Sequence, residues 1–202
     1  LYSHQEWDGK SDLRHTQLKK IDIEDLLPRN QIEVDLEAIG KIFTGKCIMI
    51  TGAAGSIGSE IVRQVASFKP SQMILIDQAE TPLHDIRLMM MHKFADIPAL
   101  TLTASISHKC HMEAVFKEYK PDYVFHAAAY KHVPMMEDNP GEAVVNNIDG
   151  TRIIADLAVK YKTKKFVMVS TDKAVNPTNV MGCSKRICEM YCQSLNKAIA
   201  DG

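Results

Sequence analysis

The chain has 202 residues, of which 46% are hydrophobic and 24% charged, and this balance excludes disordered, collagen-like and disulfide-stapled polypeptides. A formal net charge of −1 removes the whole-molecule electrostatic case for nucleic acid or an anionic membrane as a partner. No apolar run reaches the ~18–20 residues that a membrane-spanning helix needs, and no signal peptide opens the chain. The five cysteines form no CxxC pair, a pattern typical of a reduced, cytoplasmic protein.

Residues 1–40 are polar and rich in charge, with one short predicted helix at Ile21–Leu27 that Pro28 ends. We interpret them as an N-terminal linker or helical extension, and residues 41–202 as a single domain. In that domain, short apolar runs alternate with helical patterns. The predicted strands are Lys46–Thr51, Met73–Asp77, Ala99–Ala104, Asp122–Ala127 and Phe166–Ser170. Five helices are predicted. The first ends at Phe68, the second begins at Thr81, the third spans Glu113–Tyr119, the fourth begins at Asn139 and the fifth spans Met181–Ile199.

Strands that alternate with helices require right-handed crossover connections, and continuous apolar strands indicate a parallel sheet covered on both faces. We therefore predict an α/β fold, a Rossmann-like doubly wound parallel sheet with helices on both faces. In the helix from Asn139, Gly150 costs about 1 kcal/mol relative to alanine and indicates a close approach. The last helix carries one apolar stripe that suits the core or an interface, made of Cys188, Cys192, Leu195 and Ile199.

A glycine-rich segment, Thr51–Gly58 (TGAAGSIG), follows the first predicted strand and opens the first predicted helix. Gly52 permits the tight turn, and Gly55 lets backbone amides approach a pyrophosphate. Gly58 lets the helix pack closely on the sheet, and the helix N-terminus supplies partial positive charge. A turn that is glycine-rich by chance is the alternative, but the strand-loop-helix context favours a dinucleotide site.

Asp77, at the end of the second predicted strand, distinguishes between two cofactors. A carboxylate there accepts hydrogen bonds from both adenosine ribose hydroxyls and repels a 2′-phosphate. The next residues, Gln78 and Ala79, offer no cation to such a phosphate. The pattern therefore predicts NAD in preference to NADP.

The glycine spacing resembles the extended short-chain dehydrogenase/reductase superfamily, whose members modify nucleotide sugars with a Tyr-x-x-x-Lys pair. The pair Tyr161 and Lys165 lies before the fifth strand in a basic run, where we predict a helix end and a solvated turn. After the fifth strand, where the pair belongs, stand Met181 and Lys185. Methionine has no proton to exchange, so the usual base for oxidising a hydroxyl is absent.

An acid and a base stand side by side at the end of the fifth predicted strand, where Asp172 and Lys173 follow Thr171. Open parallel sheets place their chemistry at the carboxyl edge of the strands. A plain ion pair is the alternative interpretation.

Four longer segments narrow the resemblance: Asp25–Arg29 (DLLPR), His126–Pro134 (HAAAYKHVP), Thr171–Ala174 (TDKA) and Asn176–Gly182 (NPTNVMG). Together they resemble the CapD-like family of bacterial UDP-N-acetylhexosamine 4,6-dehydratases, which serve capsular polysaccharide biosynthesis and protein glycosylation. The resemblance runs from about Ile23 to Asn196. The chain departs from the family at the end of the third strand, where Ala-Ser replaces Gly-Asp and a weaker or rearranged adenine contact is expected.

The resemblance implies transient NAD-dependent oxidation of UDP-N-acetylglucosamine, or a related UDP-N-acetylhexosamine, at C4. Elimination of water across C5–C6 and return of the hydride to C6 would follow. It implies that Lys173 is the base at C5, that Asp172 protonates the departing hydroxyl, and that Thr171 holds the C4 oxygen. Lys185 would bind the nicotinamide ribose. The base for the C4 hydroxyl stays open between Asp172 and a bound water.

The expected binding residues form two groups. Along the cofactor, we expect Gly52, Ala54, Gly55, Ser56, Ile57, Gly58, Asp77, Ser105, Ile106, Ala127, Ala128, Ala129 and Lys185. Around the sugar substrate, we expect Lys131, His132, Asn176 and Met181, although His132 packed in a loop is an alternative. No metal site is expected, because His108–His111 is predicted to be the first turn of a solvated helix with Ser107 as its N-cap.

Two other functions remain open. A UDP-sugar 4-epimerase shares the first steps, but its chemistry relies on the tyrosine that Met181 replaces. A binding module or inactive fragment is favoured by the end at Gly202, since the superfamily closes its pocket with a C-terminal lobe of about 100 residues. Because the chain begins at Leu1, we expect a piece of a longer, homo-oligomeric cytoplasmic protein, with a membrane anchor in that parent left open.

Overall fold

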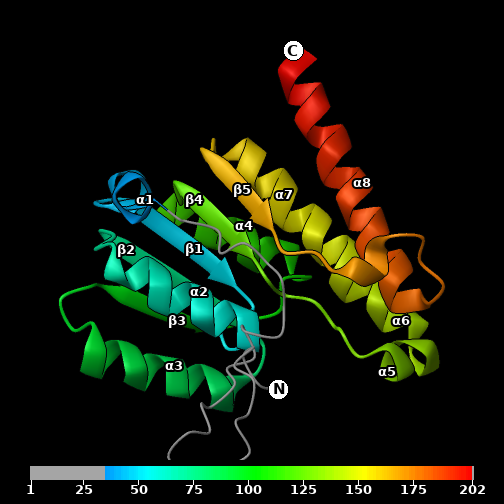
Figure 1. Ribbon diagram of the computed structural model, residues 1–202, viewed down its shortest axis with the longest axis horizontal. Coiled ribbons are helices and arrows are strands. Elements are labelled where there is room, and N and C mark those ends of the chain that lie inside the picture. Colours follow the sequence, from blue (N-terminus) through cyan, green and yellow to red (C-terminus); the bar gives the residue numbers. More distant parts are fainter. Residues whose placement is uncertain (1–34, 202) are drawn as a thin grey trace, which may run out of the picture. The chain divides into compact units, whose positions relative to one another are not determined.

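The computed structural model describes residues 35–201, and this part contains one parallel sheet in the strand order β3-β2-β1-β4-β5 (Figure 1). The strands are β1 Cys47–Thr51, β2 Gln72–Asp77, β3 Ala99–Thr103, β4 Tyr123–His126 and β5 Lys165–Met168. All five predicted strands are confirmed, each within two residues at its ends. The order places β1 at the centre, where the direction of winding reverses between β2 and β4.

Helices follow the strands and cover both faces of the sheet (Figure 1). The longer ones are α1 Leu36–Phe43, α2 Ser56–Ser67, α3 Glu80–Lys93, α4 Lys109–Tyr119, α7 Gly150–Lys160 and α8 Val180–Asp201. The shorter ones are α5 Val133–Asp138, α6 Pro140–Glu142, a π-helical segment η3 Ala143–Asp149 and a 3₁₀ turn η4 Asp172–Ala174. The predicted doubly wound Rossmann-like fold is therefore confirmed.

Alternate residues of the central strand β1 pack into the two apolar clusters that lie on opposite faces of the sheet. Ile48 and Ile50 pack with buried residues of α2 and α3, whereas Met49 packs with those of α4 and α7. All three side chains are fully buried. This alternation follows from the two-residue period of a strand, and burial of both faces explains the continuous apolar runs.

The predicted helix from Asn139 is one helical run from Pro140 to Lys160, but a π-helical segment interrupts it. Asn139 stands at the N-cap position, but its side chain makes no capping hydrogen bond, and its side-chain amide donates to the Met135 carbonyl instead. The close approach predicted at Gly150 is confirmed. A Cβ there would lie 2.5 Å from Cδ1 of Ile106, beyond the end of β3.

Two further predictions concern helix starts and faces. The cap position of α4 is His108, not Ser107, whose hydroxyl is hydrogen-bonded to Ser105. The turn that follows His108 is exposed, as predicted. On α8, Cys188 is buried but Ile199 is 54% exposed, so the apolar stripe joins the core only in its first half.

The predicted helix at Ile21–Leu27 and the motif at Asp25–Arg29 lie outside the described residues. Residues from Leu36 onward form one compact unit, so α1 lies across the predicted domain boundary at residue 40. Phe43 of α1 packs edge-on against Tyr123 and Phe125 of β4. The division into residues 1–40 and 41–202 stays a prediction. Across residues 35–201, no helix is both long and apolar enough to cross a membrane.

Candidate functional site

The loop between β1 and α2 requires its glycines for steric reasons. Gly52 has a φ of +69°, and a Cβ there would lie 2.6 Å from the carbonyl carbon of Ala127. A Cβ on Gly58 would lie 1.9 Å from the carbonyl oxygen of Gly52. The helix that follows has neither a side-chain cap nor an acidic residue in its first turn. Its free backbone amides therefore face the loop, as an anion-binding helix N-terminus requires.

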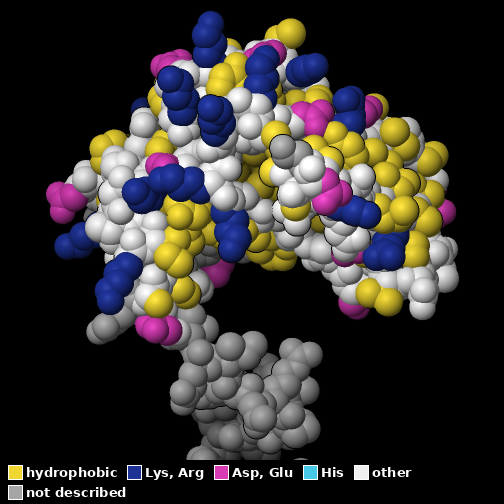
Figure 2. All heavy atoms as spheres, turned by 90° about the horizontal axis from the view of Figure 1, so that it is seen from above, with side chains coloured by type: hydrophobic (Ala, Val, Ile, Leu, Met, Phe, Trp, Pro, Cys, Tyr) yellow, Lys and Arg dark blue, Asp and Glu magenta, His cyan; other side chains and the backbone are white. Residues whose placement is uncertain are grey.

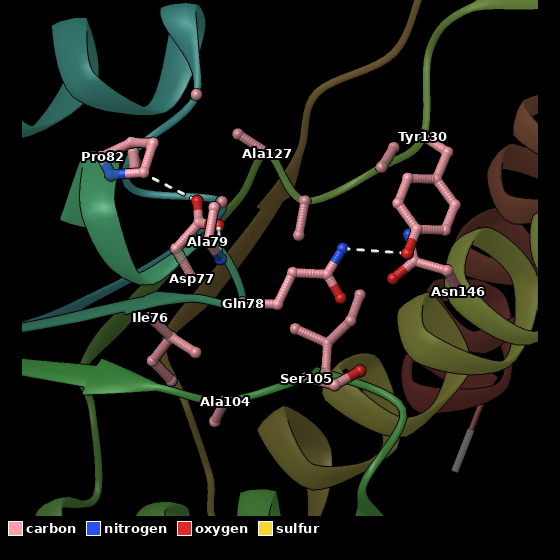
Figure 3. Close-up of a pocket in the computed structure, with 16 residues that line it drawn as sticks. Ile76, Asp77, Gln78, Ala79, Pro82, Ala104, Ser105, Ala127, Tyr130 and Asn146 are labelled. Carbon is pink, nitrogen blue, oxygen red and sulfur yellow. Dashed lines mark hydrogen bonds between the residues drawn. The ribbon is translucent and has the colours of Figure 1, made fainter.

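A cavity of about 310 Å³ opens at the carboxyl edge of the sheet beside this loop (Figure 3). Its volume lies at the lower end of the range for small-molecule sites. Its lining is Gly52, Ala54, Gly55, Ile76, Asp77, Gln78, Ala79, Pro82, Ala104, Ser105, Ile106, Ala127, Ala128, Ala129, Tyr130 and Asn146. The structure thus brings together nine of the expected cofactor residues. The four expected residues outside the lining are Ser56, Ile57, Gly58 and Lys185.

Asp77 braces the loops on both sides of the cavity. One carboxylate oxygen accepts the N–H of Ala54 at 3.0 Å, and the other accepts the N–H of Ala79 at 2.9 Å. Each oxygen keeps a second lone pair. The carboxylate can therefore position the glycine loop and still accept a hydroxyl from a ligand.

Gln78 and Tyr130 approach each other from opposite sides of the cavity (Figure 3). The Gln78 side-chain amide donates to the Tyr130 hydroxyl at 3.0 Å. Because Gln78 follows β2 and Tyr130 follows β4, this bond joins the two halves of the sheet edge. Both residues line the cavity, and sequence reasoning named neither as a site residue.

His126, the last residue of β4, is fully buried beneath the loops. Its two ring nitrogens are hydrogen-bonded to Thr51 at 2.7 Å and Thr151 at 2.9 Å. Burial, and then the nearby Lys185 ammonium, lower the pKa of His126 to about 3. The imidazole is therefore neutral at physiological pH, and it ties the end of β1 to α7.

Lys185 points into the protein. It is 5% exposed, and its ammonium donates to the Val169 carbonyl at 2.7 Å. Burial lowers the pKa of this lysine. Its hydrogen bond joins α8 to the segment that follows β5.

Asp172 and Lys173 form an exposed pair on η4, with the aspartate side chain 88% and the lysine side chain 51% exposed. The Thr171 hydroxyl donates to the Asp172 carboxylate at 2.9 Å, and the Lys173 ammonium lies 3.5 Å from the same oxygen. The Thr171 hydroxyl first, and then the Lys173 charge, lower the pKa of Asp172. An exposed ion pair contributes little to stability. The ion-pair interpretation therefore explains the short distance between the two side chains, but it does not explain why an acid and a base stand at the carboxyl edge of the sheet.

The start of α8 packs directly on this pair. A Cβ on Gly182 would lie 2.3 Å from the Lys173 carbonyl oxygen. Met181 is 3% exposed and packs in an apolar cluster with Met136 and Ala143, so it does not line the cavity. Lys131 and His132 are exposed after β4, and Asn176 is exposed with a φ of +46°.

Asn147 is a positioning residue that sequence reasoning missed. It is fully buried in the π-helical segment, and its amide donates to the Tyr130 carbonyl and to the Ser184 hydroxyl, both at 3.0 Å. Its oxygen accepts the N–H of Tyr130 at 2.8 Å. It thus joins the loop after β4 to α8. The signal available in the sequence was the pair Asn146-Asn147, two polar residues within an otherwise apolar helical pattern.

The sheet order, the glycine loop after β1 and the acid after β2 define a Rossmann-fold protein with the short-chain dehydrogenase/reductase layout. Residues 48–201 match the family described as "Polysaccharide biosynthesis protein". The chain belongs to this family, and the resemblance seen in its motifs is confirmed.

Curated relatives agree with this assignment. The capsular polysaccharide biosynthesis protein CapD of Staphylococcus aureus is 47% identical over 92% of this chain and 31% of its own length. The probable polysaccharide biosynthesis protein EpsC of Bacillus subtilis is 44% identical, over 90% of this chain and 30% of its own length. The chain thus spans about a third of these relatives. An inverting UDP-N-acetylglucosamine 4,6-dehydratase of Campylobacter jejuni is 32% identical over 71% of this chain and 42% of its own length.

Solved structures confirm the fold. Pen from Bacillus thuringiensis superposes with a TM-score of 0.68 at 33% identity, covering 76% of this chain and 45% of its own. A UDP-glucose 4-epimerase of Thermotoga maritima, solved with UDP-glucose, gives a TM-score of 0.63 at 27% identity, covering 75% of this chain and 51% of its own.

Proposed function

We propose that this chain is the cofactor-binding and catalytic part of an NAD-dependent nucleotide-sugar 4,6-dehydratase, a lyase of polysaccharide or glycan biosynthesis. The substrate class is UDP-N-acetylglucosamine or a related UDP-N-acetylhexosamine. One observation carries the proposal: an acid-base pair, Asp172 and Lys173, stands at the same sheet edge as a glycine-lined cavity. The tyrosine that a dehydrogenase needs is replaced by Met181, which is buried in an apolar cluster.

The residues present fit NAD. A Cβ on either Gly52 or Gly58 would lie within 2.6 Å of backbone, so the tight loop that a diphosphate-binding helix N-terminus follows needs glycine at both positions. Asp77 retains lone pairs for the adenosine ribose, and no lysine or arginine lines the cavity to receive a 2′-phosphate. These observations support NAD over NADP.

When bound, the nicotinamide would supply hydride acceptance at sugar C4 and hydride return at C6. The chain's own residues would move two protons, each taken up and then given back. Because the pKa of Asp172 is lowered, its side chain is a carboxylate at neutral pH and can accept the proton of the C4 hydroxyl. Lys173, once it has given its own proton to solvent, would take the proton at C5. Asp172 would return its proton to the hydroxyl that leaves C6 as water. Lys173 would return its proton to C5 as the hydride reaches C6, so both side chains end the cycle in the state in which they began it.

The surrounding residues would position this pair. Thr171 donates to Asp172 and would hold the C4 oxygen as well. Lys185, whose ammonium donates to the Val169 carbonyl, would bind the nicotinamide ribose and supply positive charge to it. Lys131, His132, Asn176 and Met181 stay proposed substrate residues, with Met181 acting through its packing in the apolar cluster.

The test is incubation of UDP-N-acetylglucosamine with this chain and with a longer form of the protein, followed by product analysis. A 4-keto, 6-deoxy product supports the proposal. A 4-epimer would establish the runner-up, a 4-epimerase; a UDP-glucose 4-epimerase of Rickettsia canadensis is 36% identical over 73% of this chain and 43% of its own length. Bound NAD without product would indicate a binding module.

We also propose that the protein is a cytoplasmic homo-oligomer. Exposed hydrophobic side chains include Val144 and Val145 on η3 and Ile187 and Met190 on α8. Figure 2 shows hydrophobic surface gathered on the side of the molecule where these elements lie in Figure 1. Patches of this kind mark association surfaces. Sedimentation of the protein over a range of concentrations tests this part of the proposal.

A further inference from the structure

The segment between β5 and α8 leaves the sheet just before the acid-base pair. The pairing of β5 with β4 ends at Met168, and the N–H of Val169 then donates to the His126 carbonyl at 2.9 Å. Asp172 and Lys173 lie beyond the part of the chain that these bonds hold. Their position therefore depends on contacts from outside the sheet.

Helix α8 provides two such contacts, to consecutive residues of the segment. The Lys185 ammonium donates to the Val169 carbonyl at 2.7 Å, and the Ser170 hydroxyl donates to the Glu189 carboxylate at 2.6 Å. Residues four apart lie on one face of a helix, so Lys185 and Glu189 approach the segment from the same side. The first contact ends at a backbone atom, whereas the second fixes a side chain next to Thr171.

The Glu189 carboxylate is ionised and has a partner for each oxygen. One oxygen accepts the Ser170 hydroxyl, and the other accepts the Arg186 guanidinium at 3.1 Å. The Ser170 hydroxyl is the main cause of a lowered pKa for Glu189, so this side chain is charged at neutral pH. A hydrogen bond to a charged acceptor is shorter and stronger than one to a neutral group. Glu189 does not line the cavity, so it contacts the segment and not the cofactor site.

From Ser170 the connection continues to the acid-base pair. Ser170 adjoins Thr171, whose hydroxyl donates to the Asp172 carboxylate at 2.9 Å and accepts the N–H of Lys173 at 3.4 Å. A rotation of the chain at Ser170 would move the Thr171 hydroxyl away from Asp172. Ser170 is exposed, so its bond to Glu189, and not burial, holds it in place.

Resting on the proposed dehydratase function, we propose that Glu189 is a positioning residue of the reaction. By holding Ser170, it fixes Thr171 and therefore the Asp172 carboxylate for proton transfer with the sugar. A catalytic group displaced by about 1 Å loses about a hundredfold in rate. Loss of the Glu189 carboxylate should therefore slow the chemical step and leave cofactor binding unchanged.

Steady-state kinetics of the full-length protein with UDP-N-acetylglucosamine test this role. Glu189→Ala and Ser170→Ala should each lower kcat about ten- to a hundredfold, with KM and the NAD dissociation constant within about twofold of wild type. The double variant should be no slower than the slower single variant, because both substitutions break the same hydrogen bond. Glu189→Gln should keep kcat within about fivefold of wild type, because its amide oxygen still accepts the Ser170 hydroxyl.

The pH dependence of kcat/KM separates positioning from a loss of stability. A weaker hydrogen bond from Thr171 raises the pKa of Asp172, so Glu189→Ala should move the acid limb to higher pH. Destabilisation alone would lower the melting temperature without moving that limb. Arg186→Met is the matched control, because it removes the other partner of Glu189, an exposed pair, and should leave both kcat and the limb unchanged.

Wild-type kcat in both Ser170→Ala and Glu189→Ala, with turnover lost in Asp172→Asn, would overturn this role and leave the proposed function standing. The role would also be overturned if the two losses multiply in the double variant. Turnover slowed as much by Arg186→Met as by Glu189→Ala would overturn it too, because the hydrogen bond to Ser170 would then not be the cause. A wild type that forms no 4-keto product would refute the proposed function, and the role of Glu189 with it.

Discussion

The carboxylate of Asp77 accepts the backbone N–H of Ala54 at 3.0 Å, so the end of β2 holds the glycine loop that follows β1. The same carboxylate accepts the N–H of Ala79 at 2.9 Å. One residue therefore fixes the shape of the glycine loop and, in the proposed NAD complex, would also present the acceptor for the adenosine ribose. The proposal thus makes cofactor preference and loop geometry depend on the same side chain.

Asp77→Asn should weaken NAD binding and reduce discrimination against NADP. An asparagine has one acceptor oxygen, so its NH₂ group would face one of the two backbone N–H donors. We expect the NAD dissociation constant to rise about tenfold, with a loss of about 1–2 kcal/mol in the free energy of unfolding. Calorimetric titration with both dinucleotides checks this. Asp96→Asn, at an exposed turn before β3, is the control. If the ratio of the dissociation constants for NAD and NADP is unchanged in Asp77→Asn, Asp77 does not determine the preference for NAD.

Gly58→Ala should abolish dinucleotide binding and lower the melting temperature. The new Cβ would lie 1.9 Å from the Gly52 carbonyl oxygen, a backbone atom that cannot move without opening the loop. Gly141→Ala is the matched control, since nothing lies within 4 Å of a Cβ there. Thermal unfolding with and without NAD measures both effects. Retention of NAD-dependent stabilisation in Gly58→Ala would show that the loop does not hold the dinucleotide.

The features that were predicted correctly are local in sequence. The steric need for Gly52 and Gly58 could be predicted because strand, loop and helix follow one another directly along the chain, and each glycine has one geometric reason to stand there. The strand order follows from the same alternation, because crossover connections are right-handed. Gly150 was interpretable for the same reason, as a glycine within an otherwise regular helical pattern.

The features that were missed depend on contacts distant in sequence. Asn147 acts on Tyr130 and Ser184, and Gln78 acts on Tyr130 across 52 residues. No periodicity encodes such pairs. The π-helical segment was missed for a related reason: it retains helical hydrophobic spacing while turning Asn147 inward toward those partners. Met181 was assigned to the substrate from its motif, and that role stays a prediction; what the motif did not indicate is its burial, which depends on how α5 and α8 meet.

Substitution of the acid-base pair should separate binding from turnover. Asp172→Asn and Lys173→Met should each lower dehydratase turnover at least a hundredfold, because each removes one proton transfer. Both side chains are exposed and outside the cavity, so the NAD dissociation constant should stay within twofold of wild type. Product formation from UDP-N-acetylglucosamine and calorimetry with NAD give the two readouts. Near-normal turnover in either variant would refute the assigned role.

The pH dependence of kcat/KM offers a second view of Asp172. Its pKa is lowered by the Thr171 hydroxyl and then by Lys173, so this carboxylate, for which we propose a catalytic role, stays ionised below the ordinary aspartate pKa of about 3.9. No acid limb from this residue is expected above about pH 4. Thr171→Val removes the donated hydrogen bond and should move the acid limb to higher pH. A limb that does not move in Thr171→Val would show that another group controls it.

His126 should make stability pH-dependent. Its pKa is about 3 in the folded protein and about 6.5 in an unfolded chain, so the unfolded state binds more protons between these values. Stability is therefore fully present above pH 6.5 and is lost as pH falls toward 3, by at most about 1.4 kcal/mol per pH unit from this group. Urea unfolding at pH 7 and pH 5 should show a smaller difference in His126→Gln than in wild type. His92→Gln, an exposed histidine of α3, is the control.

Met181→Tyr should not restore the activity pattern of a tyrosine-dependent enzyme. Met181 is 3% exposed and packs with Met136 and Ala143, so a tyrosine there would bring a larger ring and a hydroxyl into an apolar cluster. We expect a loss of about 1–3 kcal/mol in stability and no increase in 4-epimer formation. Met181→Leu keeps volume and polarity and should cost less than about 1.5 kcal/mol. Urea unfolding and product analysis separate the two effects. A stable Met181→Tyr variant with increased epimerase activity would mean that the side chain at this position reaches the substrate, and the proton route through Asp172 would have to be abandoned.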